Sequence, residues 1–299
     1  MRNDNTNGHH ARLTAGAARG RLRDLLAGSR CVRPASVFDP MSMRMAADLG
    51  FEIAMLGGSV AALAVLGTPD HTLLTLTEFA GLGRRLCRTG ALPLLVDADH
   101  GFGNALNAMR CVEELETSGV AGMTIEDSEL PAPYGAPGGR IVGIDEAAAK
   151  IAAAVAARSD TDFAVVARTT VGAEQAASGK PIDDLRERAS AFAAAGAQAI
   201  FLARARHIQE VETVAKASGL PIILAAAKGE LESVDLASLG VRICLRGHDT
   251  IARAASGAWQ SLADAAGRDE GPPGGLIARF SEEERYDRLI SAYLKPSSV

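Results

Sequence analysis

Aromatic residues are scarce in this chain of 299 residues: Phe, Trp and Tyr make up 4% of it, whereas hydrophobic residues of all kinds make up 47%. A core of alanine and small aliphatic side chains suits helices packed closely on strands better than an aromatic-rich β-sandwich. Cysteine is scarce too, and no C-x-x-C pair occurs, which argues against structural zinc and a disulfide framework. The four cysteines, which we expect in a reducing compartment, are Cys31, Cys87, Cys111 and Cys244.

Blocks of one charge and long apolar runs are also missing. The formal net charge is −5 and no Lys/Arg block occurs, so nucleic acid is not an expected partner. No apolar run reaches the ~18 residues that suggest a membrane span, and the N-terminal "MRNDNTNGHH" has no apolar signal segment. We therefore expect a cytoplasmic protein with no membrane partner. Residues 1–12 are expected to form a disordered tail.

Eight short runs of β-type residues alternate with helical patterns. Each run is apolar throughout instead of alternating with polar residues, as expected for strands covered on both faces in a parallel sheet. Eight strands joined by helices predict a closed (β/α)8 TIM-type barrel, and a doubly wound open sheet is the alternative. The predicted strands are 35–38, 53–56, 92–96, 121–125, 163–167, 198–202, 221–224 and 241–245.

Helical patterns with capping signals occur between these strands. We expect Thr77 to open the first of them and Asp145 to cap the third, while Gly90, Gly119 and Gly196 mark C-terminal ends. The four predicted helices span 75–90, 104–119, 145–159 and 183–196.

The C-terminal part follows a different pattern. The barrel is predicted over 13–266, a Gly/Pro-rich linker over 267–280, and a last helix in 281–299. Ser281, with Glu284 at the capping-box position, is expected to cap that helix. A helix beyond a linker often docks elsewhere, and a second subunit is one candidate.

Acidic residues follow two neighbouring strands at the end of the barrel where active sites occur. Asp97 and Asp99 end the third strand, and Glu126 ends the fourth. Residues i and i+2 of an extended backbone point to the same face, so both aspartates are expected to reach one ion. Mg²⁺ takes oxygen ligands and often few direct protein ligands, and it is the expected ion. The alternative is a network of ion pairs between these acids and arginines at the same rim, namely Arg168, Arg204 and Arg246.

Other residues at strand ends suggest an anionic substrate. Arg168 offers a planar two-pronged donor for a carboxylate, or else it pairs with a rim acid. The segment "GGS", 57–59, offers backbone N–H groups, or else forms a plain tight turn. His248 is a candidate hydrogen-bond donor, although a lone histidine is more often structural. The segment "GFGNAL" lacks the third glycine of a dinucleotide motif and follows two acids, so NAD binding is not expected.

Several motifs, taken in order, resemble the isocitrate lyase / phosphoenolpyruvate mutase superfamily from about residue 20 to 260. The D-x-D-x-G-[FY]-G segment with a later I-E-D is the specific part of this resemblance. The motifs are "SVFDPMSMRMAADLGFEIAMLGGSVA", "LGTPD", "LPLLVDADHGFGNA", "GVAGMTIEDSELP", "VVARTT" and "RGH".

The resemblance implies an α/β barrel, a Mg²⁺ ion (Mn²⁺ being possible) and an α-keto or α-hydroxy carboxylate substrate. It also implies a homo-oligomer, either a dimer or a homotetramer built as a dimer of dimers, in which the eighth helix is swapped between subunits; we expect the swapped element to be the C-terminal helix at 281–299. Within the superfamily the chain looks most like the branch that decarboxylates oxaloacetate. Transferred motif by motif, the resemblance makes Asp97 the direct metal ligand and places Asp99 and Glu126 behind water. It makes Gly57, Gly58, Ser59, Arg168 and His248 the substrate-binding residues, with Arg168 and His248 also catalytic.

The segment after the fourth strand departs from other branches. Isocitrate and methylisocitrate lyases have a Lys-[Lys/Arg]-Cys-Gly-His loop there, whereas this chain has "LPAPYGAPGGR", residues 130–140, with no Cys, Lys or His. The same loop offers no recognisable group for a phosphoryl substrate. The resemblance therefore implies decarboxylation of oxaloacetate to pyruvate and CO₂ through a metal-stabilised enolate. The alternatives are a methylisocitrate lyase-like or phosphonopyruvate hydrolase-like enzyme, or a barrel that binds a dicarboxylate without catalysis. Asp70, in "TPD", matches a loop acid whose role varies among branches.

Overall fold

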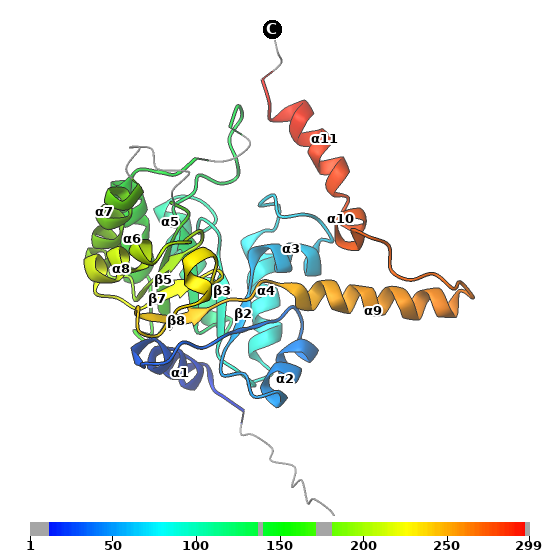
Figure 1. Ribbon diagram of the computed structural model, residues 1–299, viewed down its shortest axis with the longest axis horizontal. Coiled ribbons are helices and arrows are strands. Elements are labelled where there is room, and N and C mark those ends of the chain that lie inside the picture. Colours follow the sequence, from blue (N-terminus) through cyan, green and yellow to red (C-terminus); the bar gives the residue numbers. More distant parts are fainter. Residues whose placement is uncertain (1–11, 137–139, 172–180, 297–299) are drawn as a thin grey trace, which may run out of the picture.

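The computed structural model describes residues 12–136, 140–171 and 181–296, so most of the predicted N-terminal tail lies outside the described residues (Figure 1). The described chain contains one sheet of eight strands in the order β1 to β8, and every neighbouring pair is parallel. The strands are β1 (Ala35–Ser36), β2 (Ala54–Leu56), β3 (Leu94–Asp97), β4 (Gly122–Glu126), β5 (Ala164–Thr169), β6 (Ala199–Leu202), β7 (Ile222–Leu224) and β8 (Val241–Cys244).

The two edges of this sheet meet through the segment that precedes β1. Val32 forms a parallel bridge with Ile243 of β8. The Val32 N–H donates to the Arg242 carbonyl at 2.8 Å, and the Cys244 N–H donates to the Val32 carbonyl at 3.0 Å. The predicted (β/α)8 barrel is therefore confirmed, and the open doubly wound sheet is excluded.

Helices follow the strands, as the sequence pattern predicts, but two of them begin at other residues than expected. Thr75, not Thr77, caps the helix at 76–87, because only Thr75 lies three residues before Glu78 and completes a capping box with it. Gly143, not Asp145, precedes the helix at 144–156, and Asp145 lies in its positively polarised first turn. The helices that follow strands β1 to β7 are α2 (Pro40–Asp48), α3 (Gly58–Val65), α4 (Leu76–Cys87), α5 (Ala105–Thr117), α6 (Ile144–Ala156), α7 (Pro181–Ala194), α8 (Ile208–Ser218) and the 3₁₀ helix η1 (Gly229–Glu232).

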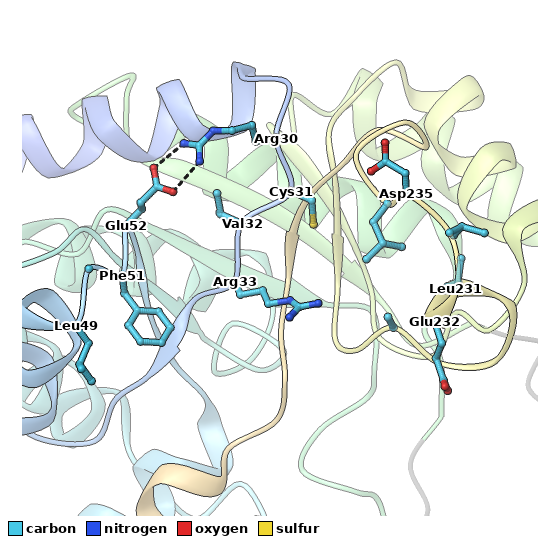
Figure 2. Close-up of a pocket in the computed structure, with 14 residues that line it drawn as sticks. Arg30, Cys31, Val32, Arg33, Leu49, Phe51, Glu52, Leu231, Glu232 and Asp235 are labelled. Atoms are coloured by element: carbon cyan, nitrogen blue, oxygen red, sulfur yellow. Dashed lines mark hydrogen bonds and ion pairs between the residues drawn. The ribbon is translucent and has the colours of Figure 1, made fainter.

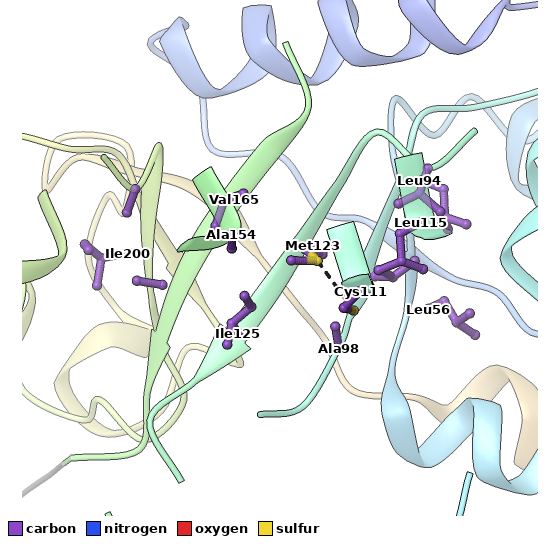
Figure 3. Close-up of a cluster of buried hydrophobic side chains, with 14 of the residues drawn as sticks. Leu56, Leu94, Ala98, Cys111, Leu115, Met123, Ile125, Ala154, Val165 and Ile200 are labelled. Carbon is purple, nitrogen blue, oxygen red and sulfur yellow. Dashed lines mark hydrogen bonds between the residues drawn. The ribbon is translucent and has the colours of Figure 1, made fainter. Parts of the chain in front are cut away.

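The apolar residues form two layers. Inside the barrel, inward-facing strand residues pack on helix α1 (Ala15–Ala27), which closes the N-terminal end of the barrel with Leu22 and Leu26. Outside it, strands pack against helices: Figure 3 shows Met123 of β4 beside Cys111 of α5, whose sulfur atoms lie 3.9 Å apart. Small side chains such as Ala154 let α6 approach the sheet closely. The low aromatic content thus reflects close packing of helices on strands.

The last three helices leave the barrel. Helix α9 (Asp249–Ala265) follows β8 but projects away from the sheet, and α10 (Leu276–Phe280) and α11 (Glu283–Tyr293) turn back beyond it (Figure 1). The predicted linker thus contains α10. Ser281 ends α10, with its N–H donating to the Ile277 carbonyl at 2.8 Å, so the expectation that it caps the last helix is wrong. Ser281 is the C-cap of α10, and the next residue, Glu282, is the N-cap of α11, so Ser281 does not occupy the capping position of the last helix.

No helix among the described residues is both long and apolar enough to cross a membrane.

All four cysteines are free thiols, and burial raises the pKa of the Cys87 thiol to about 12.

We predict that Leu22→Ala lowers the free energy of unfolding by about 2–5 kcal/mol, because it opens a cavity where α1 closes the barrel. Leu22 is fully buried. Urea unfolding followed by circular dichroism measures the change. Leu106→Ala, at a leucine that is 74% exposed, is the matched control and should stay within about 0.5 kcal/mol of the wild type. Equal losses in both variants would contradict this description of the core.

Candidate active site

All the predicted site residues lie at or directly after the C-terminal ends of strands, and strand register brings several of them together. Asp97 of β3 is paired with Thr124 of β4, and Glu126 of β4 is paired with Arg168 of β5. Gly57, Gly58 and Ser59 follow β2, and His248 follows β8. The barrel thus gathers at one mouth residues that lie far apart in the sequence.

Arg168 lies between two of the predicted metal ligands. Its Nη1 contacts Asp97 Oδ2, and its Nη2 lies 2.9 Å from Glu126 Oε2. The hydroxyl of Thr124 donates to the other oxygen of Asp97 at 2.6 Å. The ion-pair alternative considered from the sequence therefore occurs at Arg168. Its Nε is buried without a hydrogen-bond partner.

Asp99 reaches the mouth by another route than expected. Strand β3 ends at Asp97, and Asp99 has a left-handed φ of 47°, so the argument from i and i+2 on an extended strand is wrong. A tight turn aims its carboxylate at α3 instead. A Cβ atom on Gly58 would lie 2.6 Å from Asp99 Oδ1, so only glycine fits there.

The carboxylates are crowded and poorly solvated. Burial raises the pKa of Asp99 well above its ordinary value, and the charges of Asp97, Asp70 and Glu126 raise it further. Burial also raises the pKa of Asp70 and of Glu126, while Arg168 opposes both shifts. Asp70, whose role was left open by the sequence analysis, thus belongs to the same electrostatic group. One guanidinium does not balance four neighbouring carboxyl groups.

Within residues 12–136, 140–171 and 181–296, no three His, Cys, Asp or Glu side chains converge closely enough to enclose a metal ion by themselves. The donor set nevertheless fits a hard cation held partly through water. Its donors are carboxylate oxygens, their repulsion favours a cation, and Mg²⁺ characteristically retains several waters. Asp97, with Asp99 and Glu126 behind water, would hold such an ion.

His248 is held against the backbone on the other side of the mouth. Its Nδ1 lies 2.9 Å from the Ser36 hydroxyl of β1, and burial lowers the pKa of the imidazole. A Cβ on Gly57 would lie 2.7 Å from its Nε2. The pair of glycines thus makes room for His248 on one side and Asp99 on the other. Sequence reasoning missed Ser36, since a hydroxyl inside an apolar strand gives no separate signal.

The glycine pair also begins helix α3. Gly57 is the N-cap, and Gly58 and Ser59 form the first turn, where backbone N–H groups have no partner within the helix. Such a helix start binds anions through these donors and the helix dipole. It lies beside the acids and His248, as expected for one end of a carboxylate substrate.

A cavity of about 1050 Å³ extends outward from the mouth. Asp70, Glu126, Arg168 and Arg204 line its polar part. Helix α11 of the same chain lines the opposite side, where the Tyr286 ring lies 5.7 Å from the His71 ring. Apolar side chains complete this wall, and they are Leu130, Pro131, Ile141, Leu289, Ile290 and Leu294.

Asp127, the acid that directly follows β4, has a structural role. Asp127 is buried and pairs with Arg188 of α7 at 3.2 Å, and it accepts from the Thr170 N–H at 3.2 Å. It thereby joins β4, β5 and α7.

In the loop after β4, residues 137–139 lie outside the described part of the chain.

The fold and the mouth define a class: an α/β-barrel enzyme with carboxylates, a guanidinium and a helix start at the C-terminal strand ends. The phosphoenolpyruvate phosphomutase family matches residues 22–266, and the chain belongs to this family.

Similar proteins were found both in sequence and in structure. The chain is 46% identical over 283 residues to an oxaloacetate decarboxylase of Rhodopseudomonas palustris, covering 94% of this chain and 96% of that protein. It is 47% identical over 266 residues to an oxaloacetate decarboxylase of Bradyrhizobium diazoefficiens, covering 89% and 90%.

Two solved structures share the fold. A phosphonopyruvate hydrolase in complex with oxalate and Mg²⁺ is 29% identical, with a TM-score of 0.70, and the match covers 93% of this chain and 99% of that one. An oxaloacetate acetylhydrolase is 24% identical, with a TM-score of 0.73 and coverage of 96% and 100%, which supports the fold alone.

We predict that Asp99→Asn raises the free energy of unfolding at pH 7 in metal-free buffer by more than about 0.5 kcal/mol, the usual range of surface substitutions. The pKa of Asp99 is raised in the folded state, so its ionisation opposes folding above the ordinary value of 3.8 and has no effect well below it. The gain should therefore be smaller at pH 5 than at pH 7. Urea unfolding with a chelator present measures both values.

Asp97→Asn is the matched control for this prediction. Asp97 is paired with Arg168 and accepts from Thr124, so its neutralisation should lower the stability at pH 7. If both variants changed stability in the same direction, the description of the electrostatics would be wrong.

Proposed function

We propose that this protein is a divalent-metal-dependent oxaloacetate decarboxylase, which converts a keto-dicarboxylate to pyruvate and CO₂. The observation that carries the proposal is the mouth itself, where Arg168 lies between Asp97 and Glu126. The relatives that are 46–47% identical over nearly their whole length are named oxaloacetate decarboxylases, and this supports the assignment.

Asp97 would hold Mg²⁺ directly, and Asp99 and Glu126 would hold it through water; Mn²⁺ suits the same oxygen donors. When bound, the ion would act as a Lewis acid that withdraws electrons from the keto oxygen of the substrate. Arg168 and the N–H groups at the start of α3 bind and orient the substrate carboxylate next to the keto group. In this orientation the second carboxylate of the substrate would point toward the cavity.

In the reaction, the bond between C3 and C4 breaks and CO₂ leaves. The electron pair remains on the three-carbon product as an enolate, which takes a proton at C3 to give pyruvate. In the neutral tautomer of His248 whose Nδ1 accepts from the Ser36 hydroxyl, the ring proton lies on Nε2. That N–H stabilises the negative charge that develops on the substrate oxygen. No nucleophile is required.

The apolar wall of the cavity favours loss of CO₂. The side chains of Ile141, Leu289 and Ile290 solvate a neutral product better than a carboxylate. The loop after β4 contains none of the Cys, Lys or His groups that a lyase of the superfamily would use there.

We predict Mg²⁺-dependent pyruvate release from oxaloacetate that exceeds the release in a matched solution of metal without protein. Asp97→Ala should abolish this activity in a folded protein, and His248→Ala should lower kcat by about 10²–10³. A coupled pyruvate assay measures both variants, and His207→Ala, at the exposed N-cap histidine of α8, is the matched control.

Methylisocitrate and phosphonopyruvate are assayed beside oxaloacetate. Faster turnover of either would replace the proposal by the corresponding lyase or hydrolase. Binding of oxalate without turnover of any keto acid would instead identify a barrel that is not catalytic. Full activity of Asp97→Ala would refute the proposed site.

We propose that the site works in a homo-oligomer in which helix α9 is swapped, and not the C-terminal helix at 281–299 that the sequence suggested. Only Ala263 of α9 is buried within its own chain, and the helix projects from the barrel (Figure 1). A groove of about 540 Å³ lies beside β1 and β8, where an eighth barrel helix would pack (Figure 2). Figure 2 shows Leu49 and Phe51 on one side of it and Leu231 on the other. The four free thiols are consistent with a cytoplasmic location.

We predict that Leu49→Glu and Leu262→Glu, at leucines that are 75% and 70% exposed in the single chain, each shift the protein toward a monomer. A charge on either side would be buried in the swapped interface. Light scattering during size-exclusion chromatography measures the mass. Leu106→Glu, on α5 and equally exposed, is the control; an unchanged mass for both test variants would contradict the swap.

A further inference from the structure

The turn that carries Asp99 has an unusual backbone. Within residues 99–103, Asp99, Gly101, Phe102 and Gly103 all have positive φ, with values of 47°, 79°, 61° and 148°. Glycine adopts such angles freely, but each non-glycine residue there costs about 1–3 kcal/mol. Surrounding contacts must therefore hold this turn, and two of them are backbone bonds: the Gly101 N–H donates to Ala98 O at 2.8 Å, and the Glu126 N–H donates to Asp99 O at 2.7 Å.

A third contact comes from a buried lysine. Lys150 of α6 is 5% exposed, and its Nζ donates to the His100 carbonyl at 3.0 Å. His100, in the middle of the turn, is itself buried, and its ring lies 6.4 Å from that of Phe102. A buried ammonium is costly unless it is paired or hydrogen-bonded, so its presence here needs a reason.

The charges around Lys150 partly offset that cost. Glu146, Asp127 and Glu126 attract the ammonium, although burial lowers its pKa. Lys150 thus links two features of the mouth: it bonds the turn that carries Asp99, and its charge faces the acids at the end of β4. Neither feature requires contact with substrate.

We propose that Lys150 is a positioning residue: it fixes the backbone of residues 99–103 and so keeps the Asp99 carboxylate against Gly58 and beside Asp97. The consequence for metal binding rests on the proposed metal site. Loss of a group that orients a metal ligand typically weakens metal affinity 10- to 100-fold.

Two measurements on the full-length protein test this role. In Lys150→Met, amide hydrogen exchange across residues 98–104 should be faster than in the wild type, even without metal. The Mg²⁺ dissociation constant, measured by titration calorimetry without substrate, should rise about tenfold or more. If Lys150 acted through its charge alone, removing a positive charge would tighten Mg²⁺ binding instead.

Arg19→Met is the matched control. Arg19 is another buried cation, but it lies on α1 at the opposite end of the barrel, where it pairs with Asp160 at 2.9 Å. This variant should lose stability without changing exchange in the 98–104 segment or Mg²⁺ affinity. Lys150→Gln keeps an N–H donor, should give intermediate values, and serves if Lys150→Met does not fold.

Unchanged exchange across the turn, or unchanged or tighter Mg²⁺ binding, would overturn the positioning role. A wild-type protein that binds Mg²⁺ but does not decarboxylate oxaloacetate would refute the proposed reaction and leave this role intact. A wild-type protein that binds no Mg²⁺ would refute the metal site, and the exchange data alone would then decide the role of Lys150.

Discussion

Mutual repulsion among Asp70, Asp97, Asp99 and Glu126 is the constraint on which the mouth of this barrel depends. Burial raises the pKa of three of them, and Arg168 supplies the half-buried guanidinium that lies between Asp97 and Glu126. Such a site is costly to fold and therefore suited to a cation and an anionic substrate, which together relieve the repulsion and satisfy the remaining donors. The repulsion that lowers the stability of the protein without ligands is thus the same interaction that favours the binding of a cation.

Close packing of backbone on side chains makes this crowding possible. Gly57 and Gly58 leave space for the His248 ring and the Asp99 carboxylate at distances that any Cβ would block. The left-handed turn at residues 99–103 supplies the second aspartate, and Lys150 bonds that turn from α6. Behind these groups the barrel is closely packed: α1 closes its interior, and small side chains lie between its strands and outer helices. The site therefore rests on backbone geometry as much as on the identity of its charged residues.

Helices α9 to α11 extend the protein beyond the barrel. Helix α11 gives the cavity an apolar wall, and α9 leaves a groove beside β1 and β8 uncovered in its own chain. In the proposed reaction, a cavity wall that disfavours a carboxylate and a group of acids that would hold Mg²⁺ beside Arg168 suit the loss of CO₂ from a keto-dicarboxylate. In the proposed assembly, the same C-terminal segment serves both the subunit interface and the mouth.

The sequence by itself determined the eight-stranded barrel, because fully apolar runs separated by helical periods have few other ways to bury both faces of a sheet. It also determined which residues end the strands, and hence the residues at the mouth. It did not determine that Asp99 lies on a left-handed turn instead of an extended strand, or that Ser36 bonds His248. Nor did it show that Arg168 pairs with Asp97 and Glu126, or that Lys150 supports the turn from a distant helix. The three contacts join residues separated by many positions, and the turn at Asp99 is held by such contacts. Only the closed tertiary structure decides which side chains meet, because local periodicity contains no information about distant partners.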